Sequence, residues 1–131
     1  MGSELDKKSV PREFCTARCV MRVPSVSDAS ALFEIYGNPA AMKYMQKPVY
    51  PSVEACASKI ASWMDDFSAG RSFRWGIYLP SAPSSLVGTA ALHFFSPSNR
   101  RVELGLDLAP SCWGRGYATE ITRELVRLGF D

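Results

Sequence analysis

Three runs of residues between positions 72 and 109 constrain the fold of this chain more than any other feature. The runs are SFRWGIYL, SLVGTAALHFF and RVELGLDLA. In the first and third, apolar residues occupy alternate positions, which predicts strands with one buried face. The second is apolar on nearly both faces, as expected of a central strand. The polar segment SPSNR separates the last two runs and predicts a turn, so these two strands should form a hairpin.

Segments with helical spacing flank these strands. SVEACASKIASWMDDFSAG has an apolar residue every three or four positions, with Ser52 as a candidate N-cap and Gly70 at its end. This pattern predicts an amphipathic helix. Shorter helices are expected over SVSDASALFEIY, with Ser27 as the N-cap, and over PAAMKYM. YATEITRELVRLGF, which starts at Tyr117, predicts the last helix.

The N-terminal part of the chain divides into an arm and the start of a domain. Residues 1–13 are polar and contain Pro11, so we expect a flexible arm there and one domain over residues 14–131. The segment CTARCVMRV, residues 15–23, alternates and predicts the first strand. The complete order of strand, two helices, three strands and helix predicts an α+β fold. Its sheet should be mixed but mostly antiparallel, with helices on both faces.

Composition argues against several classes of partner. The chain has 131 residues, is 47% hydrophobic and 21% charged, and carries a formal net charge of +2. Such a small charge, without a basic block, argues against nucleic acid or an anionic membrane. No segment approaches the ~18 apolar residues of a membrane span, and the first residues lack the apolar region of a signal peptide. We therefore expect a soluble, cytoplasmic protein.

The four cysteines are not arranged as metal ligands, because they form no C-x-x-C pair and no cluster with histidine. On one strand, Cys15 and Cys19 would lie on the same face about 13 Å apart, too far for a disulfide. We expect free, buried thiols and no metal site. The cysteines concerned are Cys15, Cys19, Cys56 and Cys112.

The segment PSCWGRGYATE places two glycines where the last helix should begin. The first backbone N–H groups of a helix lack partners, and the helix dipole adds about half a positive charge there. Glycine lets the main chain approach a ligand closely, and Arg115 adds a mobile cation. Together these features predict a site for a phosphate group. Taken alone, the triplet Gly114-Arg115-Gly116 could equally be a tight connection between a strand and a helix.

The wider sequence resembles a known family. VELGLDLAPSCWGRGYATEITRELVRLGF resembles the acetyl-CoA-binding segment of the GNAT superfamily of N-acetyltransferases. It looks most like the branch that includes the RimJ/RimL-type ribosomal-protein-alanine acetyltransferases. TARCVMRVPSVSDASALFEIYGNPAAMKYM and LVGTAALHFFSPSNRRVELG resemble the opening elements and the central hairpin of that branch. The resemblance covers nearly all of residues 15–131 and implies the GNAT, or acyl-CoA N-acyltransferase, fold.

That fold usually continues beyond this helix with a strand, a helix and a last strand. We therefore expect a C-terminally truncated copy of the fold, either a fragment, a natural truncation or a chain completed by a partner copy. The strand over residues 102–109 would then have an unpaired edge, which favours association with another chain, for example in a homodimer.

The resemblance also implies a site for acetyl-CoA. The pyrophosphate would bind backbone N–H groups of the turn before the last helix, and the pantetheine arm would pair with the main chain of the preceding strand. Trp113 stands where the superfamily pattern has Gln or Arg, which leaves Arg115 as the only side-chain cation in the loop. The residues expected at the coenzyme are Leu106, Asp107, Leu108, Trp113, Gly114, Arg115, Gly116, Tyr117, Ala118 and Thr119.

Glu103 is the candidate catalytic residue. An amine must be neutral to attack a thioester, and a carboxylate can take its proton, often through water. Glu103 lies on the strand face opposite the leucines, at a position where some relatives have a catalytic glutamate. The alternative is an exposed carboxylate paired with Arg74 or Arg101.

Other polar and aromatic residues are expected to have structural roles. His93 is expected to be hydrogen-bonded within the sheet, and Arg18 to be structural or solvated. Tyr36 and Tyr44 could line an acceptor pocket, but packing is the favoured reading.

The sequence therefore predicts an enzyme that transfers an acetyl group from acetyl-CoA directly to a primary amine. The amine would belong to a protein N-terminus or to a small molecule. The alternative is a catalytically incompetent module of the same fold that binds coenzyme A or a partner protein. The absent C-terminal elements favour this alternative.

Overall fold

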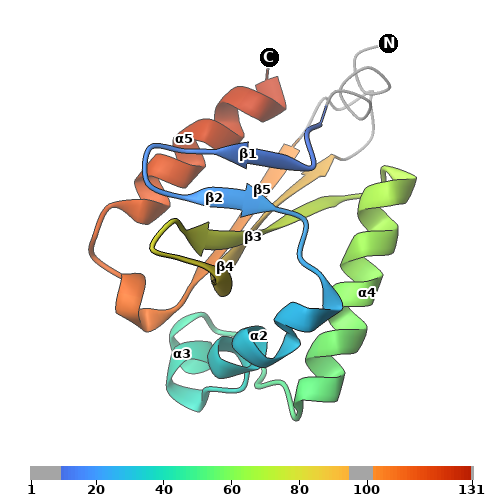
Figure 1. Cartoon of the computed structure of the whole chain (residues 1–131), viewed down its shortest axis with the longest axis vertical. Helices are drawn as coiled ribbons and strands as arrows, with labels where there is room; N and C mark the ends of the chain where they lie inside the picture. Colours follow the sequence, from blue (N-terminus) through green and yellow to red (C-terminus); the bar gives the residue numbers. More distant parts are fainter. Residues whose placement is uncertain (1–9, 95–101, 131) are drawn as a thin grey trace.

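A computed structural model describes residues 10–94 and 102–130 of the chain. The elements, in chain order, are β1 (Glu13–Cys15), β2 (Val20–Arg22), the 3-10 turn η1 (Val26–Asp28), α2 (Ala29–Tyr36), α3 (Pro39–Tyr44), α4 (Val53–Ala69), β3 (Phe73–Leu79), β4 (Ala82–Phe94), β5 (Val102–Leu108), the 3-10 turn η2 (Pro110–Cys112) and α5 (Tyr117–Phe130). Figure 1 shows the sheet running through the middle of the molecule, with α2 and α3 grouped at one end. Among the described residues, no helix has the length and apolar character needed to cross a membrane.

The five strands lie in the order β1-β2-β3-β4-β5, and each neighbouring pair is antiparallel. The predicted strands at β3, β4 and β5 are confirmed. The predicted pairing of β4 with β5 is confirmed by a register that sets Leu92 opposite Leu104 and Thr89 opposite Asp107. The turn predicted over SPSNR lies outside the described residues.

The prediction of one strand over residues 15–23 is wrong, because the chain turns back on itself there. β1 and β2 form a hairpin, with Cys15 opposite Val20. The backbone N–H of Thr16 donates to the carbonyl of Cys19 (3.0 Å), and the N–H of Cys19 donates to Thr16 Oγ1 (3.2 Å). Cys15 is exposed, so the expectation that this thiol is buried is also wrong. The other three thiols are buried, and all four are free.

Two helix starts show how local sequence positions the elements. Ser52 caps α4 as predicted, since its Oγ accepts from the N–H of Ala55 (3.1 Å). Ser27 does not cap α2. Ser25 is instead the N-cap of η1, its N–H donates to the carboxylate of Asp28 (2.9 Å), and α2 follows η1 directly.

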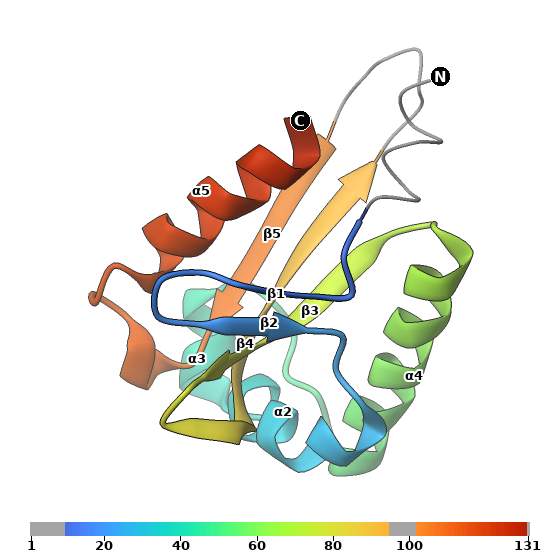
Figure 2. The ribbon, with the colours of Figure 1, turned by 45° about the horizontal axis from the view of Figure 1, so that its top comes forward.

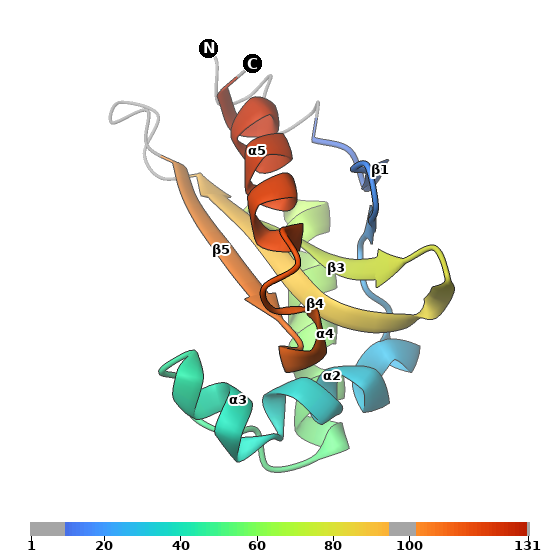
Figure 3. The ribbon, with the colours of Figure 1, turned by 90° about the vertical axis from the view of Figure 1, so that its left-hand side faces the viewer.

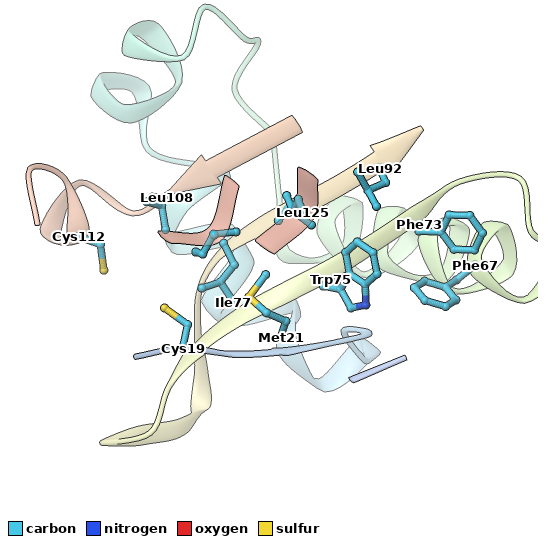
Figure 4. Close-up of a cluster of buried hydrophobic side chains, with 12 residues drawn as sticks. Cys19, Met21, Phe67, Phe73, Trp75, Ile77, Leu92, Leu108, Cys112 and Leu125 are labelled. Atoms are coloured by element: carbon cyan, nitrogen blue, oxygen red, sulfur yellow. The ribbon is translucent and has the colours of Figure 1, made fainter. Parts of the chain in front are cut away.

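Helices cover both faces of the sheet, α5 on one side and α2 with α4 on the other (Figures 2 and 3). Burial on both sides explains why β4 is apolar on nearly both faces, and β3 is also largely buried although its alternation predicted only one buried face. Figure 4 shows the core on the α5 side, where Leu125 of the helix lies over the sheet. That core includes Met21, Trp75, Ile77, Ala90, Leu92, Ile121 and Leu125. The core on the other side includes Leu32, Ile35, Cys56, Ile60, Trp63 and Tyr78.

Candidate functional site

Two glycines with positive φ angles form the turn between β5 and α5. Gly114 has φ of 74° and Gly116 has φ of 82°, a conformation that residues with a Cβ rarely adopt. A Cβ at Gly114 would meet nothing within 4 Å, so this side of the turn is open. A Cβ at Gly116 would lie 3.3 Å from Nη2 of Arg18. The backbone conformation therefore requires glycine at both positions, and Gly116 also needs the space.

The regular hydrogen bonds of α5 begin one helical turn after Gly116. The N–H of Glu120 donates to the carbonyl of Gly116 (3.1 Å), so the N–H groups of residues 117–119 come before the first helical bond. Residues 113–116, Ala118 and Thr119 are exposed. The turn thus presents exposed backbone at the positive end of the dipole of α5.

Trp113 fastens this turn to β5 and α3. Its indole Nε1 donates to the carbonyl of Leu108 (2.8 Å), the last residue of β5. Its ring stacks on Tyr44 with centroids 4.2 Å apart, although Tyr44 is 71% exposed and Trp113 36%. Tyr44 therefore packs on one side only, against a residue of the candidate site, and most of its side chain is exposed.

The first turn of α5 is fastened to the β1–β2 hairpin through Glu120. The Glu120 carboxylate accepts from Thr16 Oγ1, from the Arg18 N–H (2.7 Å) and from Arg18 Nε (2.8 Å). The Arg18 guanidinium also lies over the ring of Tyr117, 4.3 Å from its centroid. Burial alone would raise the pKa of Glu120, but the hydrogen bonds from Thr16 and Arg18 outweigh it, and the pKa is lowered.

The structural role expected for Arg18 is confirmed by its ion pair with Glu120, but its position beside the candidate turn was not predicted. Arg115 is the only cation within the loop itself, but the hairpin brings the Arg18 guanidinium beside Gly116. The sequence signal for the contact between Arg18 and Glu120 is a pair of short patterns, T-A-R starting at Thr16 and A-T-E ending at Glu120. These patterns are about a hundred residues apart in the chain, so spacing alone could not connect them.

On the other face of β5, Asp107 belongs to a buried polar network. Its Oδ2 accepts from Tyr36 Oη (2.7 Å) and from Lys47 Nζ (2.7 Å). The Tyr36 hydroxyl also contacts Thr89 Oγ1 (3.0 Å), to which Arg74 Nη1 donates (2.8 Å). Burial and the charge of Asp107 raise the pKa of Tyr36. The Asp107 side chain is therefore occupied within the protein, and only its main chain could serve a ligand at the edge of β5.

A pocket of about 320 Å³ opens on this same face of the sheet. Helix α4, the segment after α3 and strands β3 and β4 all contribute to its walls. The lining residues are Tyr36, Met42, Lys47, Pro48, Tyr50, Lys59, Ser62, Trp63, Asp66, Ser72, Arg74 and His93. Tyr36 was expected mainly to pack, and here it both packs and lines a pocket.

Glu103 lies on the pocket side of the sheet. It is exposed on β5, directly opposite His93 on β4, so both side chains share one face. Burial and then Arg74 lower the pKa of His93, whereas Glu103 and Asp66 act to raise it. Of the two expected partners of Glu103, Arg74 is bound to Thr89, and Arg101 lies outside the described residues.

The residues predicted to bind the coenzyme lie close to one another, whereas the predicted catalytic residue, Glu103, lies further along β5. Leu106 to Leu108 run into η2 and the turn, so they adjoin residues 113–119. Glu103 lies three residues before Leu106, about 10 Å along a strand. A proton passing from an amine near Leu106 to Glu103 would therefore travel through water. Within the described parts of the chain, no group of three His, Cys, Asp or Glu residues is placed to hold a metal ion.

Comparison with known proteins identifies the class. The sequence profile of the family described as "Acetyltransferase (GNAT) domain" matches residues 18–131. The chain therefore belongs to the GNAT acetyltransferase family, and the five-stranded antiparallel sheet with its helices is the GNAT fold.

Individual relatives agree with this assignment. The chain is 30% identical over 116 residues to the uncharacterized N-acetyltransferase YoaA of Bacillus subtilis (strain 168), covering 88% of this chain and 65% of that relative. The structure of this chain is similar to that of a GNAT-family acetyltransferase from Bacillus anthracis, with a TM-score of 0.73 and 21% identity. The match covers 90% of this chain and 66% of that one. The microcin C7 self-immunity acetyltransferase MccE, solved with acetyl-CoA and AMP, matches with a TM-score of 0.70 at 15% identity, covering 85% and 62%.

Proposed function

We propose that this chain carries the coenzyme site of an N-acetyltransferase that moves an acetyl group from acetyl-CoA directly to a primary amine. The observation that carries the proposal is the turn at residues 113–116, with its two left-handed glycines before α5. Membership of the GNAT family supports it. The pattern W-G-x-G-Y-A-T-E from Trp113 to Glu120 favours the RimJ/RimL-like branch, and thus a protein N-terminus or a small amine as the acceptor.

The pyrophosphate would lie on the exposed N–H groups of residues 114–119. Positive charge for it would come from the dipole of α5, from Arg115 and from Arg18 beside Gly116. Because Glu120 already binds Arg18, the guanidinium is held in place before a ligand arrives. Arg115 is exposed and can move onto the ligand.

The pantetheine arm would extend the sheet at β5. Among the described strands, β5 pairs only with β4, so its other edge presents backbone donors and acceptors. An N–H between Leu106 and Leu108 would donate to the thioester carbonyl as negative charge develops on its oxygen. The amine nitrogen then bonds to the carbonyl carbon, the C–S bond breaks, and the thiolate leaves and takes a proton from solvent.

Glu103 would act as the general base. Its carboxylate would accept the amine proton through water, a contribution of roughly 10²–10⁴-fold in such reactions. A neutral His93 opposite it supports this role, because the imidazole adds no positive charge to hold the carboxylate in an ion pair.

The alternative is a module of this fold that binds coenzyme A or a partner without turnover. The edge of β5 that does not pair with β4 favours it, because among the described strands this edge is open to a ligand or a partner. A second copy of the chain could also pair with that edge.

Two measurements separate these functions. Isothermal titration with coenzyme A tests the site, and Gly116→Ala should bind more weakly than the wild type. Acetyl-CoA-dependent thiol release with an amine present tests turnover, and Glu103→Gln should lower it at least 100-fold while coenzyme A still binds. Binding without thiol release would identify the module, and absence of binding by the folded protein would refute both functions.

A further inference from the structure

The pocket on the α4 side has an excess of positive charge. Its lining includes Lys47, Lys59, Arg74 and one carboxylate, Asp66. Lys47 is neutralised by Asp107 (2.7 Å), and Asp66 is neutralised by Arg71 (2.9 Å).

Two cations remain. Within residues 10–94 and 102–130, neither Lys59 nor Arg74 forms an ion pair with a carboxylate. A ligand in this pocket therefore meets two uncompensated positive charges.

Arg74 is held in place for a planar anion. Its Nη1 donates to Thr89 Oγ1 (2.8 Å), and its guanidinium lies over the ring of Trp63, 4.8 Å from the centroid. Thr89 is itself fixed by the hydroxyl of Tyr36. A guanidinium has five N–H donors, and a pair of them matches the two oxygens of a carboxylate. Holding the group in advance lowers the entropy lost on binding.

The rest of the pocket combines aromatic walls with polar groups. Tyr36, Tyr50 and Trp63 provide aromatic walls, and the volume of about 320 Å³ lies at the small end of the range for ligand pockets. His93, which lies opposite Glu103 on the neighbouring strand, lines the pocket together with the cations Arg74 and Lys59. A bound molecule could thus place an anionic group at Arg74 while its amine approaches Glu103.

We propose that the acceptor is a small primary amine that also carries a carboxylate, bound through Arg74 and Lys59. This inference rests on the proposed acetyl transfer and names its substrate class. Amines with two or more positive charges, such as polyamines, are excluded because Arg74 and Lys59 would repel the second charge.

The one histidine of the chain, His93, provides a readout that does not depend on activity. Its imidazole resonances can be followed by NMR in the full chain during titration with L-phenylalanine, L-phenylalaninamide or the phosphonate analogue of phenylalanine. We expect saturable shifts with phenylalanine and at least tenfold weaker binding of the amide, because the amide cannot form the ion pair with Arg74. Equal binding of the amide would overturn the proposal. Tighter binding of the phosphonate would show that the anion is of the phosphate type and would also overturn it.

Substitution of Arg74 and Lys59 tests whether these two cations cause the preference for a carboxylate over an amide. Arg74→Gln should abolish the tenfold preference for the carboxylate, and Lys59→Gln should reduce it. Lys59 is exposed on α4, so Lys59→Gln should fold normally. It can therefore test the proposal even if Arg74→Gln is unstable. The matched control is Lys43→Gln on α3, an exposed cation outside the pocket lining, which should keep the full preference. An unchanged preference in Lys59→Gln and Arg74→Gln would refute the proposal.

Titration with coenzyme A on the same sample separates this failure from failure of the proposed function. Binding of coenzyme A without discrimination between acid and amide would refute only the acceptor class. Discrimination without any binding of coenzyme A would refute the acetyltransferase and leave a carboxylate-binding pocket.

Discussion

The carboxylate of Glu120 accepts hydrogen bonds from three donors of a hairpin that lies 102 to 104 residues earlier in the chain. Single residues at the candidate site are therefore defined by partners that are remote in sequence. The positions of Gly114 and Gly116 could be predicted from the break between strand and helix. Arg18 could not, because nothing local to it distinguishes a solvated arginine from one placed beside Gly116.

Substitution of the two glycines by alanine separates backbone strain from contact. Gly114→Ala should cost about 1–2 kcal/mol, because only the left-handed conformation opposes a Cβ there. Gly116→Ala should cost more, since its Cβ would also press on Arg18 at 3.3 Å. Urea denaturation measures both free energies of unfolding. Equal losses would show that Arg18 yields freely and is not held in place by Glu120.

The stability of the protein should depend on pH through Glu120. Its pKa in the folded state is below the ordinary value of 4.5. The folded state therefore gains stability from this group above pH 4.5 and loses it as the pH falls through the lowered pKa. Glu120→Gln should lower the free energy of unfolding by about 1 kcal/mol at pH 7, and the difference should shrink below pH 4.5. A constant difference across this range would contradict the assignment, and Glu124→Gln on the same helix serves as the control.

At the level of elements, the long periodic segments were predictable and the short hairpin was not. α4, α5, β3, β4 and β5 follow from their apolar spacing, because burial on one or two faces imposes that spacing directly. Alternation continues through Thr16 to Cys19, so the sequence reads as one strand. The turn there is stabilised by α5, an element from the other end of the chain.

Helix capping gives a test at this scale. Ser52→Ala should lower stability by about 1 kcal/mol, because the N–H of Ala55 loses its acceptor at the start of α4. Ser27→Ala should change stability by less than about 0.5 kcal/mol, because Ser27 does not cap a helix. Thermal unfolding of the two variants compares them directly. A larger loss in the Ser27 variant would restore the simpler reading of the sequence.

Over the whole molecule, one sheet separates two cores, and a chain of hydrogen bonds lies on the side away from α5. The turn at residues 113–116 was predictable because it occupies one continuous segment. The pocket was not predictable. Its lining residues are spread over the chain from Tyr36 to His93 and belong to several helices, strands and loops. Periodicity assigns residues to faces but does not show which polar groups meet across elements.

Removal of the Tyr36 hydroxyl tests the network that joins α2 to the sheet. Tyr36→Phe should lower stability by about 1–3 kcal/mol, since Asp107 and Thr89 each lose a buried partner. Tyr50→Phe is the matched control, because Tyr50 packs against Tyr36 at 5.1 Å between ring centroids and lines the same pocket. Chemical denaturation compares the two. A similar loss in both variants would show that ring packing, not the hydroxyl, accounts for the effect.

The stacked rings of Tyr44 and Trp113 join the two halves of the site mechanically. Trp113 moves with the turn and with the end of β5, whereas Tyr44 ends the helix from which the chain continues to Lys47 at the pocket. If a ligand binds at the turn, we expect this contact to transmit any displacement of Trp113 to the segment that lines the pocket.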